Sequence, residues 1–186
     1  MRERKFKKKR NPRKVYLVIC EGETEKAYVE TLRRHYRLPV TIKTKVSGNN
    51  INARLIGQYV AELGVDSSDD YCIFFIYDAD VQCVADKLAT LPGTAILTNP
   101  CIELWYVLHV REHNRAVDSY EVMKNLMNSH PVWKNYMKGH LTNEQTYMLL
   151  KNYKSAIFRS EKLSWPLNPS SNMGTFINAL ENPENC

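Results

Sequence analysis

Two long apolar runs stand out in the hydrophobic pattern of the first half of the chain. VYLVIC (15–20) and YCIFFIY (71–77) are continuous, rich in β-formers and bounded by polar residues, which is typical of strands covered on both faces. TIKTKV (41–46) alternates between polar and apolar residues, and TAIL (94–97) is a short apolar run. We therefore expect a four-stranded sheet in this half.

Helical patterns separate these strands, at about residues 24–37, 52–63 and 82–90. Such alternation of strands and helices predicts an α/β fold with a mostly parallel sheet and flanking helices. No strand pattern follows residue 98, so the C-terminal half is expected to be helical.

Two Asn-Pro pairs mark expected helix starts in the C-terminal half. At 99–100 and at 168–169, asparagine is an apt N-cap and proline suits the first helical position. They predict a helix from residue 99 to about 112 and a last helix ending near Leu180. Between them, helices are expected at about 119–129 and 143–160.

The net charge of +6 is concentrated at the N-terminus. Residues 1–14 carry nine Lys or Arg and one Glu, leaving 17 basic and 19 acidic residues in the remainder. A segment of this composition does not bury enough apolar surface to order itself, so we expect a disordered basic arm. Its side chains, including Lys7, Lys8, Lys9 and Arg10, are candidates for phosphate contacts, with a solubilising tail as the alternative.

The expected organisation is thus a basic arm at 1–14, an α/β core at 15–98 and a helical extension at 99–186, packed on the core as part of one domain. No apolar run approaches the ~20 residues needed to span a bilayer, and no signal-peptide pattern is present. The five cysteines contain no CxxC pair and are odd in number, which argues against a disulfide scaffold and a zinc site. We expect a cytoplasmic protein with no membrane partner.

Carboxylates gather where the two apolar strands end. Glu21 follows the first run, Glu25 falls in the first turn of the next helix, and Asp78 and Asp80 follow the second run. Ligands of parallel sheets bind beyond the carboxyl ends of the strands, and residues two apart on a strand point to the same side, so we expect these groups to share one crevice.

Oxygen-only ligands in such a crevice predict Mg²⁺ or Mn²⁺. Two such ions about 4 Å apart would stabilise the attacking and leaving oxygens of phosphodiester hydrolysis. A structural alternative remains open, because acidic residues in a first helical turn, such as Glu25, commonly complement the helix dipole. For Asp78 and Asp80, an isolated DxD is a weak motif.

The combination of these motifs resembles the Toprim domain of topoisomerases, bacterial primases and several nucleases. VICEGETEKAYV and FFIYDAD match its glutamate and DxD motifs. TNPCIELWYVLH (98–109) and NPSSNMGTFINAL (168–180) are similar to motifs of RloB-like proteins, with Ile102 in place of an aromatic residue and Ser171 in place of threonine. The resemblance covers about residues 14–181.

The resemblance implies a stand-alone Toprim nuclease of abortive-infection phage defence, often encoded beside an ATPase, that attacks RNA such as tRNA. It implies that Glu21 is a metal ligand and a candidate base, that Asp78 and Asp80 are catalytic metal ligands, and that Glu25 is an additional ligand. Lys26 is a candidate contact for the scissile phosphate, or simply a solvated lysine. The chain has no GxxxxGK[ST] loop, so any ATP dependence would come from the partner.

Two further motif residues, Glu103 and His109, are candidate accessory groups. They lie six positions apart on a predicted helix, so they do not share one face. Each also has a structural alternative: Glu103 would complement the helix dipole, and His109 would be a packed core histidine.

Lysines and tyrosines alternate along the helix predicted at 143–160. Lys151, Lys154 and Arg159, with Tyr147 and Tyr153, could guide a nucleic-acid strand, or they form a solvated face. Two other functions stay open, a non-catalytic nucleic-acid-binding subunit and a DNA-cleaving Toprim nuclease. A chain of 186 residues leaves no room for the extra domains of topoisomerases or primases.

Overall fold

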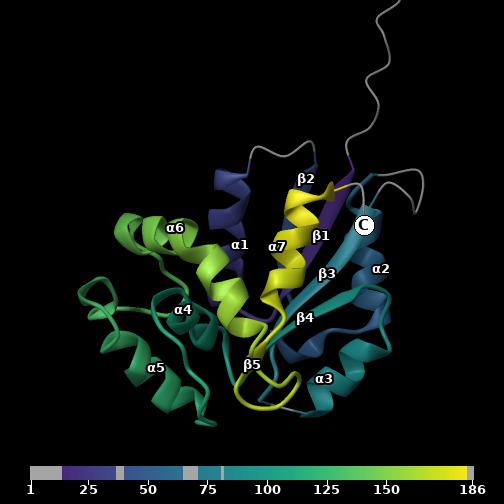
Figure 1. Cartoon of the computed structure of the whole chain (residues 1–186). Coiled ribbons are helices and arrows are strands. Elements are labelled where there is room, and N and C mark those ends of the chain that lie inside the picture. Colours follow the sequence, from purple (N-terminus) through teal and green to yellow (C-terminus); the bar gives the residue numbers. More distant parts are fainter. Residues whose placement is uncertain (1–13, 37–39, 65–70, 81, 184–186) are drawn as a thin grey trace, which may run out of the picture.

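The computed structural model describes residues 14–36, 40–64, 71–80 and 82–183 (Figure 1). The arm candidates Lys7, Lys8, Lys9 and Arg10 lie outside these residues. Lys14, expected as the last residue of the arm, belongs to the fold, because its carbonyl accepts a hydrogen bond of 2.9 Å from the backbone N–H of Thr41.

The fold is α/β with a mostly parallel sheet of five strands in the order β2-β1-β3-β4-β5. The parallel strands are β1 (Val15–Cys20), β2 (Thr41–Val46), β3 (Tyr71–Asp78) and β4 (Thr94–Asn99). β5 (Ser170–Ser171) pairs antiparallel with β4. The prediction of four strands missed β5, because a strand of two residues is too short to show a hydrophobic pattern.

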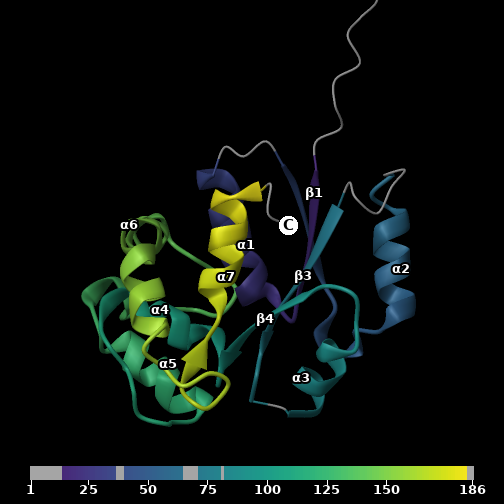
Figure 2. The same ribbon diagram turned by 45° about the vertical axis from the view of Figure 1, so that its right-hand side comes forward.

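Helices cover both faces of the sheet. They are α1 (Glu23–His35), α2 (Ala53–Ala61), α3 (Gln82–Ala89), α4 (Ile102–Val110), α5 (Ser119–Met127), α6 (Asn143–Ser160) and α7 (Met173–Glu181), with the short 3₁₀ helices η1 (Gly48–Asn50) and η3 (Pro131–Trp133). In Figures 1 and 2, α2 and α3 lie on one side of the sheet, and α1, α7 and the helices α4 to α6 lie on the other.

Alternation along the buried strands builds the two apolar layers. Tyr16 and Val18 of β1 belong to the cluster under α1, α4 and α7, whereas Leu17 and Ile19 belong to the cluster under α2 and α3. Successive side chains of a strand point to opposite faces, so a continuous apolar run is what a sheet covered on both faces requires. The helical half shares the first cluster with the sheet, since Trp105 of α4 is part of it.

The two Asn-Pro pairs do not start helices, which corrects the prediction. Asn99 is the last residue of β4, and α4 begins at Ile102 after the N-cap Cys101. Asn168 precedes β5, and α7 begins only at Met173. Both Asn–Pro bonds are cis.

Both asparagine side chains hold loops together. Nδ2 of Asn99 donates to the carbonyl of Pro166 at 3.1 Å. Asn168 donates to the carbonyl of Val117 at 2.9 Å and accepts from its N–H at 3.3 Å. The amides therefore bridge segments that are distant in sequence, a use that local capping rules do not predict.

The strand order reverses between β1 and β3. The chain leaves β1 to form β2 on one side, and then returns to form β3 on the other side of β1. Ligands of α/β sheets bind at such a switch point, beyond the carboxyl ends of the strands. Glu21 and Asp78 stand at this point.

Within the described part of the chain, no helix is both long and apolar enough to cross a membrane. Cys20, Cys83 and Cys101 are free thiols. Cys72 is disulfide-bonded, which the cysteine pattern did not predict.

Candidate functional site

The ends of β1 and β3 are joined by a carboxylate. Oε2 of Glu21 accepts a hydrogen bond of 2.9 Å from the backbone N–H of Asp78, and the N–H of Glu21 donates to the carbonyl of Ile76 at 3.0 Å. Burial raises the pKa of Glu21, the hydrogen bond from Asp78 opposes this, and the charge of Asp80 adds to the increase. Glu21 thus lies at the switch point in a setting that favours proton uptake.

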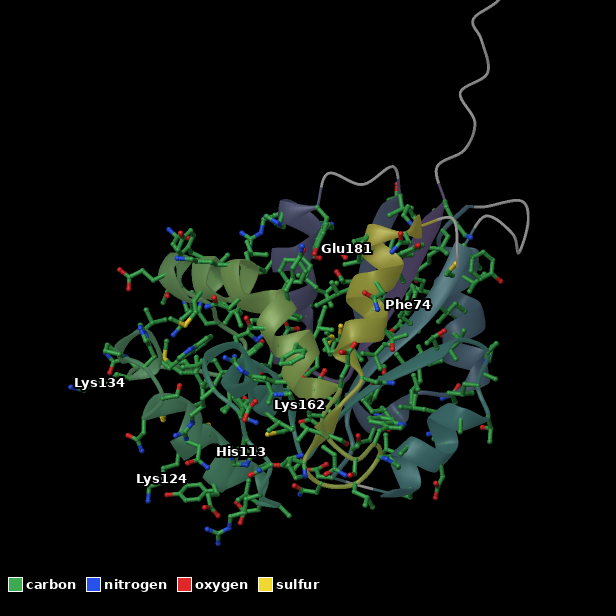
Figure 3. All side chains as sticks on the ribbon, in the orientation of Figure 1. Phe74, His113, Lys124, Lys134, Lys162 and Glu181 are labelled. Carbon is green, nitrogen blue, oxygen red and sulfur yellow. The ribbon has the colours of Figure 1, made fainter. Side chains whose placement is uncertain are left out.

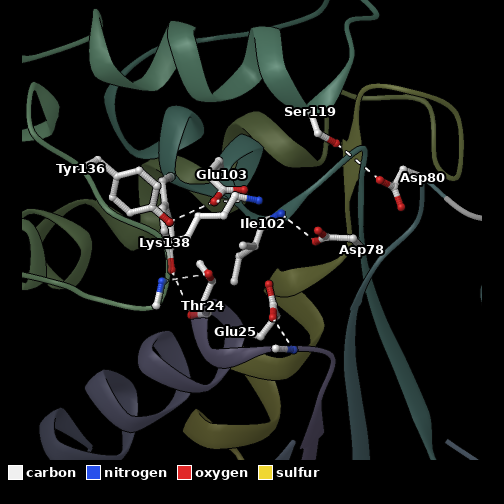
Figure 4. A network of polar contacts seen from close by, with 12 residues as sticks. Thr24, Glu25, Asp78, Asp80, Ile102, Glu103, Ser119, Tyr136 and Lys138 are labelled. Carbon is white, nitrogen blue, oxygen red and sulfur yellow. Dashed lines mark hydrogen bonds and ion pairs between the residues drawn. The ribbon is translucent and has the colours of Figure 1, made fainter. Parts of the chain in front are cut away.

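Asp78 contacts the start of α4. Its Oδ1 accepts a hydrogen bond of 2.8 Å from the backbone N–H of Ile102 (Figure 4). Burial, followed by the charges of Glu25, Glu21 and Glu103, raises the pKa of Asp78 to about 9, despite the hydrogen bond from Ile102. At neutral pH Asp78 is therefore largely protonated unless a positive charge binds beside it.

Glu25 lies in the first turn of α1. Its Oε2 accepts a hydrogen bond of 2.8 Å from the N–H of Gly22 (Figure 4). A Cβ on residue 22 would lie 3.2 Å from that oxygen, so glycine leaves room for the carboxylate. Burial raises the pKa of Glu25, and the charges of Glu21 and Glu103 contribute to the increase.

Glu103 of α4 faces the same acidic group and is fully buried. Its Oε1 accepts a hydrogen bond of 3.0 Å from Tyr136 Oη and pairs with Lys138 Nζ at 3.5 Å (Figure 4). Its Oε2 has no hydrogen-bond partner among the described residues. We call Glu21, Glu25, Asp78 and Glu103 the acidic cluster.

Lys138 pairs with the acidic cluster through Glu103, and the sequence did not predict it as a site residue. Burial lowers the pKa of Lys138, but the charges of Glu103, Cys101 and Asp78 outweigh burial and raise it overall. The segment 134–141, between η3 and α6, carries Lys138, and it is fastened to α1 because the N–H of Gly139 donates to Thr24 Oγ1 at 3.0 Å. In the sequence, the only signal was a lysine next to a glycine, Lys138-Gly139, in a connection without periodic pattern.

Asp80 lies outside β3, which ends at Asp78. Strand spacing therefore does not relate the two side chains, and they have different partners. The carboxylate of Asp80 accepts a hydrogen bond of 3.5 Å from Ser119 Oγ (Figure 4). It lines a hollow of about 620 Å³ together with Asn99 and Asp118.

Lys26 and His109 lie apart from the acidic cluster. Lys26 Nζ pairs with Glu23 at 3.1 Å on the surface of α1. The Nδ1 of His109 is 2.8 Å from the carbonyl of Trp105, and its ring packs edge-on against Trp105. Burial lowers the pKa of His109 to about 4, so it is a neutral core histidine at physiological pH.

The candidate nucleic-acid residues of α6 divide into two groups. Lys151 and Lys154 are exposed, and the Nζ of Lys151 lies 5.8 Å from the ring centre of Tyr147. Arg159 instead donates from Nη1 to the carbonyl of Leu108 at 2.5 Å, which ties it to the end of α4. Tyr153 donates to Glu181 at 2.7 Å, and Glu181 is the last residue of α7 (Figure 3).

Within residues 14–36, 40–64, 71–80 and 82–183, no three His, Cys, Asp or Glu side chains are grouped closely enough to hold a metal ion. The chemistry of the donors nevertheless fits a hard divalent cation. In the described contacts, Glu21, Glu25 and Asp78 each use one carboxylate oxygen on a backbone N–H, which leaves the second oxygen for a cation. Burial and the charges of neighbouring carboxylates raise their pKa values, and a bound cation would oppose this increase.

Comparison with known proteins identifies the family. The profile of RloB-like proteins matches residues 16–180, nearly the whole described chain. No curated protein and no solved structure matches the chain. The chain belongs to the RloB-like protein family.

Proposed function

We propose that the protein is a Toprim-type, metal-dependent nuclease that hydrolyses phosphodiester bonds. The observation that carries the proposal is the meeting of Glu21 and Asp78 at the switch point of the sheet, with the pKa of Asp78 raised to about 9 by burial and by three neighbouring carboxylates. Strongly perturbed acids in a ligand-binding position are typical of catalytic or metal sites.

Mg²⁺ or Mn²⁺ is the cofactor that this donor set suits. Glu21, Glu25 and Asp78 would hold it through the oxygens that the backbone does not use. When bound, it would stabilise the negative charge that develops on the phosphate during hydrolysis. Asp80 lines the neighbouring hollow of about 620 Å³, and its charge raises the pKa of Glu21.

The remaining roles belong to groups of the chain itself. Glu21, whose pKa is raised, is suited to take a proton from the attacking water. Lys138 is suited to bind a phosphate oxygen next to the cluster. Glu103 orients Lys138, because its Oε1 contacts Lys138 Nζ and also accepts the hydrogen bond from Tyr136 Oη.

Substrate and setting follow from the family resemblance. We propose RNA, such as tRNA, as the substrate, and an effector role in anti-phage defence of the abortive-infection kind. A partner ATPase encoded nearby would supply the trigger, and the cytoplasm would be the site of action.

One observation favours a second function. The same carboxylates also accept backbone hydrogen bonds at the starts of α1 and α4, a structural role that needs no metal. A nucleic-acid-binding subunit with a purely structural acidic cluster would show this arrangement too.

Incubation of the purified protein with total cellular RNA and with plasmid DNA tests the proposal. We expect cleavage of RNA with Mg²⁺ or Mn²⁺, and none with EDTA. Asp78→Asn should abolish cleavage. The control Glu62→Gln should not, because Glu62 belongs to an exposed ion pair with Lys45 on the side of the sheet that α2 covers. Cleavage of neither nucleic acid, with the neighbouring ATPase added, would favour the binding subunit, and cleavage of DNA alone would identify a DNA nuclease.

A further inference from the structure

A groove of about 480 Å³ lies between η3 and the first half of α6. Its volume is in the range of small-ligand sites, about 300–1,000 Å³. Gln145, which is buried, joins the two sides by donating from Nε2 to the carbonyl of Val132 at 3.1 Å. The groove is lined by His130, Val132, Asn143, Glu144, Tyr147 and Met148, and by Lys151 and Asn152.

The lining combines an open aromatic ring with polar side chains. Tyr147 is 65% exposed, although it is a large aromatic residue. The Nδ1 of His130 accepts a hydrogen bond from the N–H of Val132 at 3.2 Å, so in the neutral ring the hydrogen is on Nε2, which is a donor. The amides of Asn143 and Asn152 add both donors and acceptors to the wall.

Two lysines of α6 follow Tyr147 on the same side of the helix. Tyr147, Lys151 and Lys154 are spaced by four and three residues, which places them on one face of the helix. Lys162, just beyond the C-terminal end of α6 (Figure 3), is already paired with Glu112 at 2.7 Å. Among the described basic residues of α6, Lys151 and Lys154 are exposed, whereas Arg159 is tied to α4.

The groove and the acidic cluster border the same connecting segment. Residues 134–141 leave η3 on one side of the groove and lead into α6 on the other. In the middle of this segment, Lys138 pairs with Glu103, and Gly139 is bonded to Thr24. A strand seated in the groove would thus lie next to the segment that reaches the cluster.

Stacking surfaces beside lysines are what single-stranded nucleic acid requires, because every base has a flat face and every linkage a negative charge. We propose that the groove binds an unstacked base of a single-stranded nucleic acid, with the base on Tyr147 and the adjacent phosphates on Lys151 and Lys154. The inference rests on the proposed nuclease function only in taking the bound strand as the substrate that is cleaved at the acidic cluster.

Fluorescence anisotropy with a short labelled oligouridine or oligothymidine, in EDTA, tests the proposal without cleavage. Tyr147→Ala should weaken binding about 5- to 150-fold, the range for loss of one stacked base. Tyr147→Phe, which keeps the ring, should bind like the wild type. Lys151→Gln should reduce the slope of log affinity against log salt by about 0.7. The matched control Arg54→Gln, an exposed change on α2, should leave the slope unchanged.

Equal binding by Tyr147→Ala and the wild type would overturn the inference, as would failure of the wild type to bind either polymer. The nuclease proposal fails on a different result. If the wild type and Asp78→Asn both bind the oligonucleotide, but the wild type cleaves nothing with any metal, the groove assignment stands and the catalytic assignment falls.

Discussion

Asp78 combines two roles at the residue scale. Its Oδ1 accepts from the N–H of Ile102, and its charge is opposed by Glu25, Glu21 and Glu103. Asparagine at this position keeps the acceptor and removes the charge, whereas alanine removes both. The pair Asp78→Asn and Asp78→Ala therefore separates the structural contribution of the side chain from its electrostatic cost.

The raised pKa of Asp78 predicts how stability depends on pH without metal. The pKa of this group is 3.8 in the unfolded chain and about 9 in the fold, so the folded state binds more protons between these values. Unfolding free energy should therefore fall as pH rises to 9, by at most about 1.4 kcal/mol per pH unit for one proton. Thermal melts in EDTA between pH 7 and 9 measure this, a window in which His109 stays neutral.

Asp78→Asn should show a shallower fall over the same window, and Asp78→Ala should melt below Asp78→Asn, because a lost helix cap costs about 0.5–2 kcal/mol. An identical slope in wild type and Asp78→Asn would mean that Asp78 is ionised in the fold and that the cluster is not strained.

The pair of Glu103 and Lys138 makes a second prediction at this scale. Removing Lys138 takes away the cation that is paired with a fully buried carboxylate, whose Oε1 then keeps the hydrogen bond from Tyr136. Lys138→Met should therefore destabilise the wild type more than it destabilises a Glu103→Gln background, with a coupling energy of about 0.5–3 kcal/mol. Urea unfolding of the four proteins in this cycle gives the coupling energy. A value within about 0.3 kcal/mol of zero would contradict the contact.

Residues at strand ends could be found from the sequence, and residues brought in by loops could not. Glu21 and Asp78 directly follow long apolar runs, so their place at the sheet edge follows from the strands. Tyr136 and Lys138 lie in a connection without periodic pattern, and only the tertiary fold brings them to Glu103. Asp80 was linked to Asp78 by strand spacing, but β3 ends at Asp78, two residues before Asp80.

At the element scale, accuracy followed the strength of the local signal. β1, β2 and α6 begin and end where the pattern predicted them, α6 because Thr142 accepts from the N–H of Gln145 and starts the helix. The predicted starts of α4 and α7 were wrong. An asparagine before a proline has the local pattern of a helix N-cap, but the partner of Asn168 is Val117, which is distant in sequence.

The segment that carries Lys138 depends on one glycine. Gly139 has φ +75°, and a Cβ there would lie 3.2 Å from Glu23 Cβ. Gly139→Ala should destabilise the protein by about 1–3 kcal/mol and reduce cleavage by displacing Lys138. The control Gly57→Ala lies within α2 with open space around it, and should instead stabilise by up to about 1 kcal/mol. Melting temperatures of both variants test this, and equal effects would contradict it.

On the scale of the whole molecule, charge is divided between an acidic site and a basic N-terminus. Residues 1–13 contain eight of the 26 Lys and Arg. If they contact phosphates, their deletion should weaken nucleic-acid binding and flatten its salt dependence, because fewer counterions are released. Binding of labelled oligouridine in EDTA over a range of salt measures the slope. An unchanged slope would identify the arm as a solubilising tail.

The reversal of strand order places Glu21 and Asp78 side by side, and the central claim is that this pair binds a divalent cation. Melting temperatures of wild type and Asp78→Asn, each at pH 8 with EDTA and with Mg²⁺, test the claim most directly. At 100 times its dissociation constant Mg²⁺ should stabilise wild type by about 2.7 kcal/mol, or roughly 5–11 °C. Asp78→Asn should melt no lower than wild type in EDTA and should gain much less from Mg²⁺. A clear loss of stability in EDTA, with an intact Mg²⁺ shift, would contradict the account.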